Sequence, residues 1–154
     1  MPRKAAIVGV ADTPLKDGVP SQVEEHSMTM IDVAPGWILE VERGSDWLFV
    51  RVSCQPDRMW DNPPLGEMLW GLLEQNLTHR LVLECDRLQV LHSALVGQLV
   101  LLHKRITTHG GIMRISGLSE SNQRVLQANR LDDRFPNFLD RSEAVLGYRP
   151  KQPR

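Results

Sequence analysis

Two neighbouring runs near residue 40 are rich in residues that favour strands, the first alternates apolar with polar residues at its end, and together they predict an antiparallel β-hairpin. The first run covers residues 37–42, and the second, which is apolar at most positions, covers residues 47–52. Gly44, Ser45 and Asp46 lie between the two runs and are residue types that favour a tight turn. A hairpin closed at this turn is therefore the first regular element that the sequence predicts.

Four later segments carry helical signals. Residues 63–76 and 93–108 repeat apolar residues every three or four positions, residues 119–129 begin with an acidic first turn, and residues 142–146 suit a short last helix. Asn62 is the expected N-cap of the first of these helices. The expected buried face of the longest helix consists of four leucine and isoleucine residues: Leu95, Leu99, Leu102 and Ile106.

Short apolar runs at residues 80–85 and 112–115 alternate with these helices along the chain and suit buried strands. Strands that are separated by helices pair in parallel through right-handed crossovers. We therefore expect an α/β domain with a mixed central sheet, an N-terminal hairpin and helices packed on the sheet.

Composition fits one soluble domain. The chain has 154 residues, of which 42% are hydrophobic and 24% are charged, and its net charge is −1. A protein with this net charge has no overall positive potential that would bind the phosphates of a nucleic acid. No apolar stretch approaches the ~20 residues of a membrane span. We expect a cytoplasmic protein with no direct nucleic-acid partner and no membrane span.

Turn-forming residues and a polar patch distinguish the start of the chain from the regular patterning that follows. We expect residues 1–30 to form an N-terminal extension that lies on the domain or stays mobile. The domain itself is expected to cover residues 31–148, and residues 149–154 are expected to form a C-terminal tail.

The sequence offers little catalytic or metal-binding chemistry. It lacks a phosphate-binding loop, a dinucleotide-binding fingerprint, an HExxH motif and a GxSxG motif. Cys54 and Cys85 form no CxxC pair and lie in apolar runs, so we expect reduced thiols in the core. His92 and His103 would lie about 16 Å apart on one helix, too far for one metal ion, and solvated or end-capping histidines are expected. We expect no enzyme, no cofactor and no metal site.

Ser93 stands where the chain leaves a buried strand, turns and enters the longest predicted helix. One interpretation is structural: Ser93 is an N-cap whose hydroxyl accepts a backbone N–H, which stabilises the helix by ~1 kcal/mol. The other is functional, because a phosphate on this hydroxyl would gain free backbone N–H groups and the positive end of the helix dipole.

The order of several motifs resembles the STAS domain, the fold of the bacterial anti-sigma factor antagonists. The resemblance covers roughly residues 37–148, and the best-matched part is residues 81–84 leading to residues 92–97. The family usually reads LVLD and then DSSGLG at these two places. Residues 131–136 stand where the family has a GLDRLFP-like segment, and residues 142–146 stand where it has a closing helix.

The resemblance implies a non-catalytic regulatory protein that works by binding. In such antagonists the first serine of DSSG is phosphorylated by a partner that is both a serine kinase and an anti-sigma factor. The unphosphorylated antagonist binds this partner and thereby releases the sigma factor. Ser93 matches that serine, whereas His92 replaces the family's aspartate, Ala94 its second serine and Leu95 its glycine.

These departures leave two further hypotheses open. One is a STAS scaffold, or a subunit of a larger complex, that has no phosphorylation switch. The other is a small-ligand or nucleotide-binding STAS module that uses a pocket beside the Ser93 turn. A homodimer through exposed Trp37 and Trp47 is a further possibility, although both residues could equally lie in the core.

A protein partner is expected to dock on the side of the 93–108 helix that faces away from the core. Small residues and one exposed leucine on this side would let another protein approach closely. The expected partner-binding residues are His92, Ala94, Gly97, Gln98 and Leu101.

Overall fold

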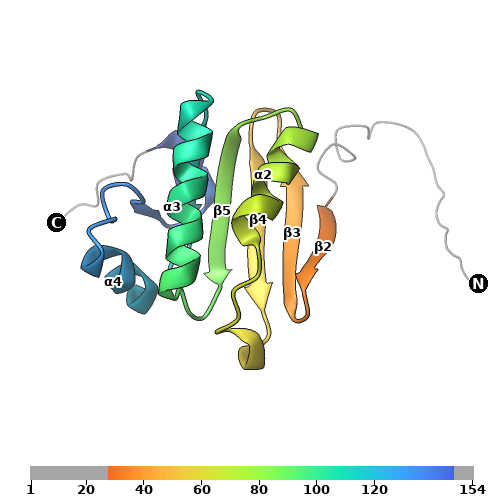
Figure 1. Ribbon diagram of the computed structural model, residues 1–154. Coiled ribbons are helices and arrows are strands. Elements are labelled where there is room, and N and C mark those ends of the chain that lie inside the picture. The colour runs from red at the N-terminus through yellow and green to blue at the C-terminus, as the bar shows by residue number, and fades with distance from the viewer. Residues whose placement is uncertain (1–27, 148–154) are drawn as a thin grey trace, which may run out of the picture.

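The computed structural model describes residues 28–147, which form one mixed β-sheet (Figure 1). Helices cover both faces of this sheet. The strand order is β2-β3-β4-β5-β6-β7; β2, β3 and β4 pair antiparallel, and the pairs from β4 to β7 are parallel. The strands are β2 Met28–Ala34, β3 Trp37–Arg43, β4 Leu48–Cys54, β5 Arg80–Arg87, β6 Ile112–Ser116 and β7 Asn137–Phe138.

Four α-helices and a short 3-10 helix connect or follow these strands. They are η2 Pro56–Arg58, α2 Leu65–Gln75, α3 Ser93–Thr108, α4 Glu120–Ala128 and α5 Arg141–Leu146. Helices α2 and α3 lie side by side on one face of the sheet (Figure 1). No helix among residues 28–147 has the length and apolar character needed to cross a membrane.

The predicted α/β fold is confirmed, including the hairpin. Strands β3 and β4 pair in the register Leu39 opposite Val52, and the Gly44 amide closes the turn by donating to the Trp47 carbonyl over 2.8 Å. Strand β2 was not predicted. It begins at Met28, within the last residues of the segment assigned to the extension, and Met28 and Met30 are exposed, so hydrophobic patterning gave little sign of it.

The main core lies between the sheet and helices α2 and α3. The inward side chains of β3, β4 and β5 meet the predicted face of α3, where Leu95, Leu99 and Leu102 are buried. A second, smaller cluster lies on the opposite face, where Ala144 of α5 packs with Trp47 and Val82. Because neighbouring residues of a strand point to opposite faces, a single strand such as β5 serves both clusters.

Trp37 and Trp47 are both buried, so the alternative that places them in the core is correct and neither offers an exposed ring for dimerisation. Trp37 also holds a loop in place, because its indole N–H donates to the carbonyl of Arg58 over 3.0 Å. Residues 1–27 of the predicted extension, the last residue of the predicted domain (148) and the predicted tail (149–154) lie outside the described residues.

Both cysteines are buried and unpaired, as expected from their apolar surroundings. Burial, with smaller contributions from Asp86 and Glu84, raises the pKa of the Cys85 thiol to about 12. We therefore predict that iodoacetamide at pH 8 leaves Cys85 unmodified in the native protein and modifies it in guanidinium chloride, because the reagent needs the thiolate. Peptide mass spectrometry measures both rates, and equal labelling in the two states would contradict this placement.

Candidate functional site

A buried asparagine shapes the loop that leads from β5 into α3. The side chain of Asn122 in α4 accepts the Leu91 amide proton over 3.0 Å and donates to the Leu88 carbonyl over 3.0 Å. These two bonds satisfy backbone groups that the loop would otherwise bury unpaired. They also fix where the chain turns into the helix, and therefore where His92 and Ser93 lie.

His92, and not Ser93, is the N-cap of α3. Its backbone is extended and its Nδ1 accepts the Leu95 amide proton at 3.4 Å, while its Nε2 lies 2.7 Å from the Asp61 carbonyl oxygen. Both contacts fit a neutral imidazole that carries its proton on Nε2. The structural interpretation of Ser93 is therefore wrong, and the expected end-capping histidine is found at His92.

Because His92 caps α3, the Ser93 hydroxyl is not used as the N-cap. Ser93 is the first residue of α3 and is exposed, and its hydroxyl has no hydrogen-bond partner within residues 28–147. The first turn of α3 contains no acidic residue. A negative charge on Ser93 would therefore meet the positive end of a 16-residue helix without competition from a carboxylate of that turn.

The outward side of α3 matches the prediction at three positions. Ala94 and Gly97 are exposed, and Leu101 is 67% exposed, so it is not covered by a loop. A methyl group added at Gly97 would meet nothing within 4 Å. Small exposed residues and one exposed leucine thus follow Ser93 along the helix.

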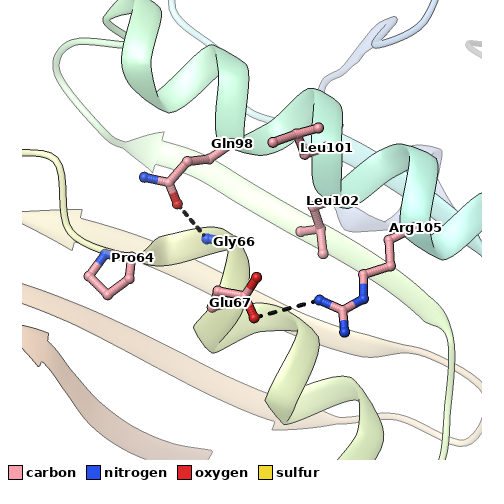
Figure 2. A pocket seen from close by; sticks show the side chains of 7 residues that line it. All are labelled: Pro64, Gly66, Glu67, Gln98, Leu101, Leu102 and Arg105. Atoms are coloured by element: carbon pink, nitrogen blue, oxygen red, sulfur yellow. Dashed lines mark hydrogen bonds and ion pairs between the residues drawn. The ribbon is translucent and has the colours of Figure 1, made fainter.

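Gln98 is only partly exposed, because its side chain turns toward α2 (Figure 2). Its Oε1 accepts the Gly66 amide proton over 2.7 Å, and its Nε2 donates to the Asn62 side chain over 2.7 Å and to the Pro63 carbonyl over 2.8 Å. Asn62 is not the N-cap of α2, because Pro64 occupies that position and has no side-chain donor or acceptor. Gln98 supplies the missing cap from the neighbouring helix.

A mostly apolar groove of about 300 Å³ runs between α2 and α3 (Figure 2). At the end nearer Ser93 it is bounded by Gln98, and Leu101 forms part of its wall. At the other end Arg105 lies 3.5 Å from Glu67 and stacks 4.3 Å from the centre of the Trp70 ring. The lining residues are Pro64, Gly66, Glu67, Gln98, Leu101, Leu102 and Arg105.

We predict that Gln98→Ala lowers the free energy of unfolding by about 1–2 kcal/mol, because it leaves the Gly66 N–H without its acceptor. Gly97→Ala is the matched control on the same helix. It should be neutral or stabilise by up to about 1 kcal/mol, since it removes a helical glycine where space is open. Urea unfolding of both variants measures the difference, and equal stabilities would contradict the bridging role of Gln98.

The other side chains that could carry chemistry do not gather into one site. His103 is half-buried, its ring centre lies 5.2 Å from that of Phe135, and burial with the charge of Arg134 lowers its pKa. Within residues 28–147, no three histidine, cysteine or acidic side chains gather as a metal site would require. The α2–α3 groove has neither His92 nor Ser93 among its lining residues.

Trp60, which was not predicted as a site residue, lies beside His92 and Ser93. Its ring stacks on the His92 imidazole, with ring centres 6.1 Å apart and planes 20° apart, yet 70% of the residue is exposed. Trp60 lies in a loop with no hydrophobic periodicity. The available signal was a tryptophan in the otherwise polar and proline-rich stretch of residues 55–64.

Comparison with known proteins settles the family. A sequence model described as the STAS domain matches residues 61–144, which is more than half of the chain. The chain belongs to the STAS domain family. The match begins just before α2 and ends in α5, so the Ser93 turn and both helices of the groove lie inside it. No curated protein matches the chain.

Solved structures support the STAS fold. An anti-sigma factor antagonist from Mycobacterium paratuberculosis has a TM-score of 0.58 and 17% identity, covering 81% of this chain and 97% of that one. A putative anti-sigma factor antagonist from Thermotoga maritima has a TM-score of 0.58 and 17% identity, covering 71% and 93%. Moorella thermoacetica RsbS has a TM-score of 0.53 and 15% identity, covering 66% and 86%. At such identities the likeness establishes the fold alone.

Proposed function

We propose that this STAS domain is a non-catalytic regulatory module that binds a protein partner through the exposed side of α3 and is switched by phosphorylation of Ser93. The observation that carries the proposal is the exposed Ser93 hydroxyl, which has no hydrogen-bond partner within residues 28–147 because His92 caps α3 instead. The partner is an anti-sigma factor with serine kinase activity, and the module regulates transcription in the cytoplasm through it. No cofactor or nucleic acid takes part.

In the modification step a nucleoside triphosphate held by the partner supplies the phosphoryl group. The bond between Ser93 Oγ and the γ-phosphorus forms as the bond from that phosphorus to the bridging oxygen breaks, and the diphosphate leaves. The partner supplies the base for the hydroxyl proton. His92 is a poor candidate, because Asp61 and Leu95 already occupy both of its ring nitrogens.

The phosphate changes binding without unfolding the domain. It adds a charge of about −1.5 to −2 at the start of α3, where backbone N–H groups and the helix dipole stabilise it. The same charge repels the anionic nucleotide of the partner, and its bulk separates the partner from Ala94 and Gly97. The expected result is release of the partner from an intact domain.

A scaffold without a switch is the second candidate, and one observation favours it. The chain is also similar, with a TM-score of 0.55, to a structure described as the stressosome, a signal integration and transduction hub. A STAS domain in such a role would keep its partner whether or not Ser93 carried charge. The two functions therefore differ in whether a negative charge on Ser93 abolishes binding of the partner.

Affinity capture from lysate of the native organism distinguishes them. The baits are the wild type, Ser93→Ala and Ser93→Asp, with Ser121→Asp as a control that places the same charge in the first turn of α4. We expect the wild type, Ser93→Ala and the control to capture one kinase, Ser93→Asp to lose it, and phosphate to map to Ser93. Capture by all four baits with unmodified Ser93 would support the scaffold instead.

A further inference from the structure

Trp60 differs from the other three tryptophans of the chain, which are buried. An indole that is 70% exposed leaves a large apolar surface in water. Tryptophan is enriched among the few residues that dominate the affinity of protein interfaces. Its position beside His92 and Ser93 makes it part of the proposed site and not an isolated surface residue.

The structure holds this exposed ring in one place. The Asp61 carbonyl bonds the His92 ring on which Trp60 stacks, and Arg58 reaches the Asp61 carboxylate at 3.5 Å. The buried Trp37 fixes the Arg58 carbonyl, and the Gln55 amide donates to Gly36 over 2.9 Å. Because the loop is ordered before binding, a partner that buries the indole loses little conformational entropy.

We propose that Trp60, positioned by His92, is the anchor through which the protein partner docks beside Ser93. The inference rests on the proposed function and names a contact of the same site. The partner offers an apolar pocket for the indole, and the exposed carboxylate of Asp57 calls for a basic rim around that pocket. Trp60 is an anchor and His92 is a positioning residue.

This anchor explains how one phosphate controls the whole contact. Along the axis of α3, Ser93 lies between the Trp60–His92 stack and Leu101, which is about 12 Å further on. A partner that holds both Trp60 and Leu101 therefore covers Ser93. A phosphate there falls inside the interface, where water is excluded, and an unpaired buried charge is strongly unfavourable.

The anchor also accounts for the histidine at position 92. An aspartate would cap α3 equally well, because it is among the preferred N-cap residues. An aspartate offers no ring on which an indole can stack. His92 combines the two roles, and the two roles can be separated by mutation.

The test places the photoreactive residue p-benzoyl-phenylalanine at position 60, 101 or 77 in cells of the native organism. Leu77 is 90% exposed and lies just past the C-terminal end of α2, outside the groove, so it controls for exposure alone. We expect positions 60 and 101 to crosslink the same kinase, position 77 not to, and Ser93→Asp to abolish both adducts. An adduct at 101 without one at 60 overturns the anchor alone, whereas adducts at neither position contradict the proposed function as well.

The second readout is the affinity of each variant of this domain for the purified kinase that the crosslinking identifies. Trp60→Ala should weaken binding about 30-fold or more, and Leu77→Ala should leave it unchanged. His92→Asp should keep the free energy of unfolding near the wild-type value and still weaken binding about tenfold. Wild-type affinity in Trp60→Ala, or in a folded His92→Asp, would overturn the proposal.

Discussion

Arg141→Ala is expected to lower the free energy of unfolding by about 3 kcal/mol, the largest effect that a single exchange outside the apolar core should have. Glu84 in β5 is only 5% exposed, and Arg141 reaches both of its carboxylate oxygens, at 3.0 and 2.8 Å. The hydrogen bond to Glu84 raises the pKa of Arg141, so the guanidinium stays charged at any pH of interest. Without it, the one cationic partner left to the carboxylate among residues 28–147 is Arg51, at 3.5 Å.

The control is Arg124→Ala in α4, whose partner Glu120 lies 3.6 Å away and is exposed. Surface pairs of this kind contribute little, so the loss should stay below about 0.5 kcal/mol. A double variant, Glu84→Gln with Arg141→Ala, should recover part of the loss, because no buried charge remains. Equal losses in Arg141→Ala and Arg124→Ala, measured by urea unfolding, would contradict this account of the buried pair.

Leu101→Glu is expected to abolish capture of the partner while the domain stays folded. Leu101 is part of the groove wall but is not part of the buried core, so the exchange should change stability by less than about 0.5 kcal/mol. It places a charge in an apolar contact, which should weaken binding at least 30-fold.

Leu77→Glu is the control, because it adds the same charge at a more exposed leucine outside the groove. Circular dichroism confirms folding, and biolayer interferometry with the captured kinase measures affinity. Binding at full strength by Leu101→Glu would show that this side of α3 is not the interface.

Local patterns predicted the elements that depend on local chemistry. Two strand-like runs around Gly44 specified the hairpin, and apolar residues at steps of four, three and four specified the buried face of α3. Strand β2 escaped prediction because none of its side chains is fully buried: Met28 and Met30 are exposed, and Ile31, Val33 and Ala34 only partly cover the core, while backbone pairing with β3 holds the strand. Backbone pairing of that kind leaves little trace in hydropathy.

The errors at the site have a tertiary cause. Serine is a good N-cap, but the Asp61 carbonyl favours the His92 tautomer that caps α3. Asp61 precedes His92 by 31 residues in the sequence, so this contact arises only in the folded domain. Gln98 looked like a free surface residue because the cap that it supplies to α2 depends on packing between helices. Neither contact is visible from residue types at short spacing.

The departures from the usual family motif have physical roles in this chain. Leu95 is buried and extends the core, and His92 caps the helix and supports Trp60. Ala94 is a small exposed residue next to Ser93. None of the three covers the Ser93 hydroxyl, which stands exposed at the start of α3.

The most direct test is the affinity of the captured kinase for the unmodified domain and for the domain carrying phosphate on Ser93, measured by isothermal titration calorimetry. We expect at least 100-fold weaker binding of the phosphorylated form, since like charges brought together in an interface cost several kcal/mol. Melting temperatures of the two forms should agree within a few degrees. Equal affinities would contradict the switch and leave Ser93 as an ordinary exposed residue of a STAS scaffold.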